Sequence, residues 1–279
     1  GPLDINGTGT TTITASASGA DIILFNPLND FTGVVSTTGD DVKLWDKNAI
    51  NLGAATVAGD YTVYAGTTID DSGAQIITGD AAFKTHDNSS QITLNHPSNS
   101  FGGTVSYEGG IGFTVNDTDA TGFVLAGRTL VGNLVVTAAG PVTQSGALIV
   151  GGFTRITATG QNVTLTNASN DFQQEVRLAG ANVEVVDTNG IDLGASTVTG
   201  TYKVTATTGN ITDTGVLSIT GLTTLVTSAD GGDITLDGTG HTFTGNIKVT
   251  TNETNSDKDA YAMINGGSNI GLKVERGSE

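Results

Sequence analysis

Short apolar segments with an alternating pattern recur along the whole chain. Segments such as Val42-Lys-Leu44 and Val183-Glu-Val185 place apolar side chains at every second position, and Gly or Asn-Asp pairs interrupt them about every 6–10 residues. Successive side chains of a strand point to opposite faces, so the apolar pairs are expected to point inward and the residues between them outward. The pattern predicts short β-strands joined by turns and disfavours helices.

These strands are organised in a repeat of about 70 residues. Phe31, Phe101, Phe172 and Phe243 lie 70, 71 and 71 residues apart. A Leu precedes each Phe by seven residues, and a β-branched residue follows it by four: Leu24, Leu94, Leu165 and Leu236, then Val35, Val105, Val176 and Ile247. An end-to-end repeat predicts one solenoid. We expect a single β-helix over residues 10–274, made of four repeats of which the last is partial. Residues 1–9 are interpreted as a tag remnant and lead-in, and residues 275–279 as a tail.

Each repeat divides into turns of the chain. Gly39, Gly59 and Gly79 are 20 residues apart, and each is followed by Asp. The strands expected in two successive turns are 42–46, 49–53 and 56–59, then 61–65, 68–71 and 75–78. Three strands per turn and about ten or eleven turns predict a right-handed parallel β-helix. The third turn of each repeat is longer, so successive repeat Phe residues are expected three turns apart, each filling a wider turn.

Composition limits the possible partners. The formal net charge is −17, with 28 acidic and 11 basic residues, which would repel a nucleic acid. There is no cysteine for a disulfide, and no stretch approaches the roughly 20 apolar residues of a membrane helix. We expect no nucleic-acid partner, association with a membrane only through a parent protein, and a monomeric isolated segment.

Three runs, at 145–152, 162–172 and 189–200, resemble the strand repeats of filamentous-haemagglutinin-like adhesins, which Gram-negative bacteria export by two-partner secretion. The likeness covers roughly residues 10–274 and lies in rhythm and composition. It implies an extended right-handed β-helix, a secreted or outer-membrane-associated location at the cell surface, and work in adhesion or biofilm formation. The secretion-domain motifs of that family are absent apart from Asn26-Pro27, so the resemblance implies a shaft segment.

Two insertions depart from the repeat. The turn at 116–122 contains Asp117-Thr-Asp-Ala-Thr-Gly122, which matches the first half of a calcium loop but lacks the closing Glu, because Arg128 stands at the twelfth position. A plain polar turn and a calcium site therefore both stay open there, although no cofactor is expected. The second insertion is the loop at 251–259, which is a polar connection or a ligand site.

Other polar residues recur in the repeat and indicate structure. Asp46, Asp117 and Asp187 end equivalent strands, and Asn29, Asn99 and Asn170 stand two places before the Phe, as turn-forming residues do. His86, His96 and His241 have no metal-ligand spacing and are interpreted as surface or turn residues.

The candidate contact residues are aromatic. Trp45, Tyr61, Tyr64, Tyr107, Tyr202 and Tyr261 are expected to be exposed, and Trp45 on the outer side of its strand marks a contact surface. Parallel β-helices also include polysaccharide lyases and tailspike hydrolases, but Glu is scarce and the four arginines occupy unrelated repeat positions. An ice-binding solenoid would need a regular Thr array, whereas Thr drifts between strands.

We therefore interpret the chain as a non-enzymatic stalk or contact segment of a large bacterial surface adhesin, without catalytic, cofactor or metal residues. Its expected partner is a host or matrix surface, either glycan or protein. A carbohydrate-active β-helix is the alternative.

Overall fold

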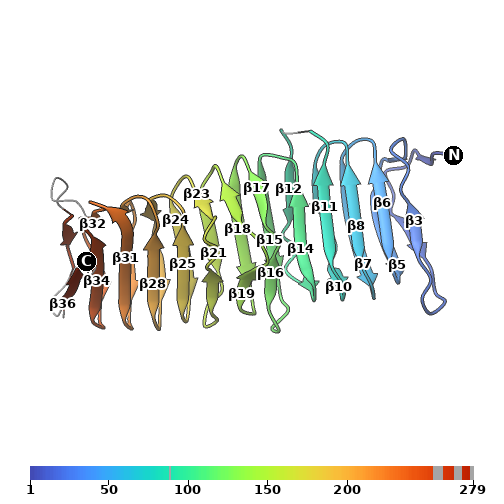
Figure 1. Ribbon diagram of the computed structural model, residues 1–279. Coiled ribbons are helices and arrows are strands. Elements are labelled where there is room, and N and C mark those ends of the chain that lie inside the picture. Colours follow the sequence, from blue (N-terminus) through green and yellow to red (C-terminus); the bar gives the residue numbers. More distant parts are fainter. Residues whose placement is uncertain (88, 254–259, 267–271, 277–279) are drawn as a thin grey trace. The chain divides into compact units, whose positions relative to one another are not determined.

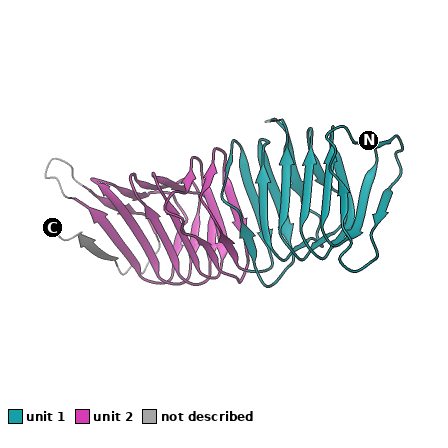
Figure 2. Cartoon of the chain, turned by 45° about the vertical axis from the view of Figure 1, so that its right-hand side comes forward, with its two compact units in different colours: residues 1–140 teal, residues 141–279 magenta. Residues whose placement is uncertain are grey.

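The computed structural model describes residues 1–87, 89–253, 260–266 and 272–276. Over these ranges the regular elements are all β-strands, and parallel strands stack as a β-solenoid of about eleven turns (Figure 1). The predicted fold class is thus confirmed. Contacts within the chain define two units, residues 1–140 and 141–279 (Figure 2).

In the first unit, one face carries a strand from each turn. These strands are β3 (Ile22–Leu24), β6 (Val42–Asp46), β8 (Tyr61–Ala65), β11 (Ala81–Thr85), β14 (Thr104–Glu108) and β16 (Phe123–Leu125). The remaining faces are made by β2 (Thr11–Thr14), β5 (Val34–Gly39), β7 (Ile50–Val57), β9 (Ile69–Asp71), β10 (Gln75–Ile77), β12 (Gln91–Leu94), β13 (Ser100–Phe101), β15 (Gly112–Asp117) and β18 (Asn133–Ala138). Two short strands, β1 (Asp4–Ile5) and β4 (Asp30–Phe31), pair with each other, and β17 is Arg128–Leu130.

The second unit repeats this arrangement. Its corresponding face contains β19 (Val142–Gln144), β22 (Val163–Leu165), β25 (Val183–Asp187), β28 (Tyr202–Ala206), β31 (Thr223–Asp230), β34 (Ile247–Asn252) and β36 (Leu272–Arg276). The other strands are β21 (Thr154–Thr157), β24 (Val176–Gly180), β26 (Ile191–Leu193), β27 (Ser196–Val198), β29 (Ile211–Asp213), β30 (Leu217–Ile219), β32 (Ile234–Leu236), β33 (Thr242–Phe243) and β35 (Ala262–Ile264). A separate pair is formed by β20 (Leu148–Val150) and β23 (Asp171–Phe172).

The core follows the alternation seen in the sequence. In β22, Val163 and Leu165 are fully buried while Thr164 between them is half-buried on the outer side. The four repeat Phe residues are also buried, as expected of residues that fill wider turns. The strands expected from residue 42 to 78 are present, except that β7 joins two of them into one. Core stability therefore comes from inward apolar residues stacked between neighbouring turns.

A repeat does not occupy a whole number of turns, and the expectation of three turns per repeat is wrong. Starting from β6, three turns lead through β8 and β11 to β14. The repeat equivalent of β6 is β15, 71 residues on, which lies on the next face of the solenoid. The second unit behaves alike, because β22 and its equivalent β32 belong to different sheets. Equivalent side chains of successive repeats therefore face different directions.

The recurring Asp residues hold the wider turns from inside. Asp187 accepts hydrogen bonds from the backbone N–H of Phe172 at 2.8 Å and from that of Asn189 at 2.7 Å. Asp46 and Asp117 bond the N–H of the Phe of their own repeats in the same way. All three are buried, so the structural interpretation is confirmed, although these carboxylates lie in the core instead of at exposed corners.

The recurring Asn residues have a matching role, and the fourth repeat replaces them with His241. Asn99 Oδ1 accepts the N–H of Gln75 at 2.8 Å, and Asn170 Oδ1 accepts the N–H of Leu148 at 2.9 Å. The Nδ1 atom of His241 accepts the N–H of Leu217 at 3.0 Å. Its Nε2 lies 3.2 Å from the carboxylate of Asp213 in the core. The expectation that His241 is a surface or turn residue is therefore wrong, because it takes the place of a buried amide.

Candidate functional site

Aromatic side chains gather on the outer face of the first unit, across β3, β6, β8 and β11. Trp45 of β6 and Tyr64 of β8 are register partners and point away from the core, because Leu44 and Val63 before them point inward. Phe25 follows β3 directly, and His86 follows β11. Phe25, Trp45 and Tyr64 are half-buried, and His86 is exposed. We call these four residues the aromatic cluster.

The four rings are in mutual contact. Phe25 lies 5.0 Å from Trp45 and 4.8 Å from Tyr64 between ring centroids, and both contacts are edge-to-face. Trp45 and Tyr64 are 5.3 Å apart, also edge-to-face. His86 stacks on Trp45 at 4.8 Å with an interplanar angle of 3°. These distances are those of favourable aromatic pairs, so the rings hold one another in place on an otherwise polar face.

Charged residues frame the cluster. Lys84 Nζ lies 5.7 Å from the centre of the Tyr64 ring and 2.7 Å from Glu108 Oε1. The hydrogen bond from Lys84 lowers the pKa of the Glu108 carboxyl, and the same bond raises the pKa of Lys84. On the other side, exposed Lys43 stands two residues before Trp45, beside Ile23, which is 66% exposed. The surface thus combines ring faces with hydrogen-bonding groups at its edge.

The cluster belongs to the first repeat alone among the repeats that can be compared. Trp45 and Tyr64 correspond to the register partners Asn116 and Thr137 in the second repeat and to Val186 and Thr205 in the third. The positions of Phe25 hold Asn95, Thr166 and Asp237, and those of His86 hold Thr159 and Ser228. Since the same strands form without these rings, the aromatic cluster is not required by the fold.

The expected exposure of the aromatic residues is correct in part. Trp45 faces outward as predicted, and Tyr261 is exposed. Tyr61, Tyr107 and Tyr202 are fully buried, so the expectation that they are exposed is wrong. Each stands at an inward position of its strand; Tyr61, for example, is in register with Val42 and Ala81, whose smaller side chains leave room for its ring. Burial raises the pKa of all three hydroxyls.

Phe25 and His86 were missed in the sequence, because each follows a strand and lies outside the alternating pattern. A column-by-column comparison of the repeats would have found them. Every column of the cluster changes from polar or aliphatic to aromatic in the first repeat.

The calcium-like turn at 116–122 lies between β15 and β16. Asp117 is buried, and its Oδ1 accepts N–H bonds from Phe101 and Asp119, while Asp119 accepts the N–H of Thr121. Burial raises the pKa of Asp117 to about 6. The structure therefore directs the first carboxylate of the motif toward the core. Within the described ranges, no group of three or more His, Cys, Asp or Glu side chains is placed to hold a metal ion.

The second insertion, 251–259, is described only as far as residue 253, so residues 254–259 lie outside the described residues. Two arginines that the sequence places at unrelated repeat positions are register partners on adjacent turns of the second unit. Arg155 pairs with Arg177, which also bonds Glu175 and lies over the ring of Phe153 at 5.2 Å.

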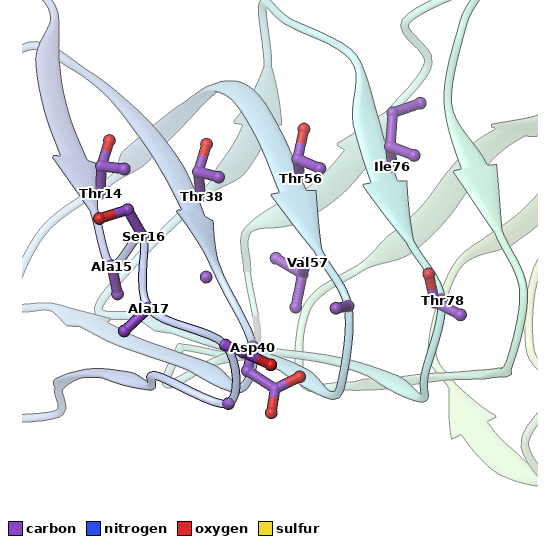
Figure 3. Close-up of a pocket in the computed structure, with 14 residues that line it drawn as sticks. Thr14, Ala15, Ser16, Ala17, Thr38, Asp40, Thr56, Val57, Ile76 and Thr78 are labelled. Carbon is purple, nitrogen blue, oxygen red and sulfur yellow. The ribbon is translucent and has the colours of Figure 1, made fainter.

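A groove of about 660 Å³ crosses the first unit where residues 15–19 leave the solenoid surface (Figure 3). Its floor carries Thr14, Thr38 and Thr56, which are in register on successive strands, and Ile76 occupies the next place. The row of hydroxyl groups is thus interrupted after three turns. The groove offers no cluster of charged or aromatic groups comparable with that around Trp45.

The fold and its period define a repeat-built parallel β-solenoid. The chain belongs to the family described as Repeats of unknown function (DUF5649), whose model matches residues 2–38, 39–108, 112–179 and 180–250. No match was found among curated proteins or among solved structures. In the part of the chain that the structure describes, no helix is long and apolar enough to span a membrane.

Proposed function

We propose that this chain is a contact segment within the shaft of a secreted bacterial surface adhesin, of the filamentous-haemagglutinin-like kind exported by two-partner secretion. The resemblance of the strand repeats to those adhesins supports the proposal, and so does the stacked, repeat-built core. Such a core lets a long chain be extended by adding turns, since each turn contacts its neighbours alone.

The observation that carries the proposal is the aromatic cluster. A passive spacer needs polar outer positions, and the second and third repeats carry Asn, Thr and Val at the positions of Trp45 and Tyr64. The first repeat instead places four mutually contacting rings on the outer face. Aromatic side chains contribute much of the binding energy at contact surfaces, which supports a role in attachment.

The proposal includes no catalytic step. Asp46, Asp117 and Asp187 are buried and accept backbone N–H bonds, so they serve the wider turns. The paired arginines face outward beside Glu175 without a second described carboxylate placed for glycoside hydrolysis. These features favour attachment over polysaccharide cleavage.

Adhesion of the whole chain tests the proposal. Protein immobilised on beads should retain bacterial-host epithelial cells, or bind members of a panel of matrix proteins and glycans, above the level of beads coated with an unrelated acidic protein. Absence of binding to every surface would contradict a contact role and leave a spacer. Release of reducing ends or unsaturated sugars from a polysaccharide panel would contradict the non-enzymatic proposal.

A further inference from the structure

We infer that the aromatic cluster binds the sugar rings of a neutral, pyranose-containing glycan. This inference rests on the proposed contact function and names the ligand class of the same surface. It commits to Phe25, Trp45 and Tyr64 as the platform and to His86 as the ring that stacks on Trp45. Lys43 and the Lys84–Glu108 ion pair supply hydrogen bonds at the edge.

The rings are suited to a sugar because of their faces. An aromatic face is electron-rich, and the axial C–H groups on one face of a pyranose are weakly positive, so the two surfaces attract and exclude water together. Around the cluster, Lys43 and Lys84 offer N–H donors and Glu108 offers carboxylate acceptors. A sugar needs both at its rim because its hydroxyl groups donate and accept.

The size of the platform also favours a short stretch of glycan. The cluster extends from the turn of β3 to that of β11, three inter-strand steps of about 4.8 Å, or about 14 Å. This length accommodates two or three pyranose rings. A specific protein partner would instead need roughly 800 Å² of complementary surface on each side, far beyond four half-buried rings.

The charge of the surroundings favours a neutral ligand. Four residues before the aromatic positions runs a stack of carboxylates, Asp21, Asp41, Asp60 and Asp80, which directly precede β3, β6, β8 and β11. Each of the first three accepts the backbone N–H of the next, at 3.2, 2.8 and 2.9 Å. This carboxylate stack lies about 13 Å along the strands from the rings and would repel an anionic sugar.

The only tryptophan of the chain lies in the cluster and reports on binding directly. The test titrates the intact protein with neutral oligosaccharides, such as chitotriose, cellotriose, maltotriose and a galactose trisaccharide, and follows the emission of Trp45. A saturable change is expected for at least one of them. Tyr64→Thr, which introduces the third-repeat residue and keeps the probe, should weaken that binding at least tenfold.

Two controls keep the result interpretable. Thr205→Ala changes the equivalent position of the second unit and should leave the affinity unchanged, and thermal melts should show that both variants remain folded. An emission that responds to none of the neutral sugars would overturn the inference. Stronger binding of sulfated or carboxylated glycans, or of a peptide, would overturn it as well, as would wild-type affinity in Tyr64→Thr. If cells still adhere to the immobilised protein in any of these cases, the inference fails while the contact function stands.

Discussion

The buried carboxylate of Asp117 makes stability depend on pH in an unusual direction. Its side chain is 1% exposed, and burial raises its pKa to about 6 from an ordinary value of 3.8, even though two N–H groups bond its Oδ1. Between these pH values the folded chain binds a proton that the unfolded chain does not. The stabilising contribution is therefore fully present below about pH 4 and is lost as the pH rises through 6.

The magnitude follows from this interval. The difference between 3.8 and about 6 corresponds to about 3 kcal/mol at about 1.4 kcal/mol per pKa unit. Asp117→Asn removes the charge and keeps Oδ1, which accepts both N–H bonds in the folded protein. We expect this variant to be more stable than the wild type at pH 7, by about 1–3 kcal/mol, and to lose that advantage at pH 4.

The assay is chemical denaturation of wild type and variant at pH 4, 5, 6 and 7. Asp187→Asn provides a contrast, because both oxygens of Asp187 accept an N–H and the amide can replace only one of them. It should gain less or lose stability at pH 7. Asp70→Asn, at an exposed position, controls for the change in net charge. An Asp117→Asn variant whose unfolding free energy follows the wild-type pH dependence in parallel would refute the reasoning.

Two further predictions concern the strands. Leu165→Asp buries an unpaired carboxylate and should cost several kcal/mol, whereas Thr164→Asp on the outer side should cost less than about 1 kcal/mol; equal losses in urea denaturation would show that the inward phase is misassigned. Asp60→Asn keeps the Oδ1 acceptor for the N–H of Asp80 and removes one charge from the carboxylate stack. It should raise the melting temperature at low salt and reduce its dependence on salt, and a lower melting temperature at low salt would contradict like-charge repulsion there.

The strands and the inward residues could be predicted from the sequence because each depends on local alternation. Val163 and Leu165 are buried for the reason that the pattern gives, and the repeat identified the buried Phe residues. Tyr61 and Tyr202 were misassigned because their hydroxyl groups suggested exposure. Their parity with Val63 and Val204 in the same strands indicates the inward face that they occupy.

The arrangement of faces could not be predicted, because it depends on the corners. Whether a repeat closes after three turns or part of a turn later is set by the conformation of the connections, which the apolar period does not record. For the same reason the sequence did not bring Phe25 and His86 to Trp45, since they come from different turns. His241 was predictable in principle, because it stands in the column of Asn99 and Asn170.

The central claim is that the aromatic cluster makes the contact while the solenoid only displays it. The most direct measurement compares adhesion of the wild type with that of the double variant Trp45→Val and Tyr64→Thr, which gives the first repeat the residues of the third. The account predicts an unchanged strand-dominated circular dichroism spectrum, a melting temperature close to that of the wild type, and a loss of most of the adhesion. Undiminished adhesion by the folded double variant would contradict it.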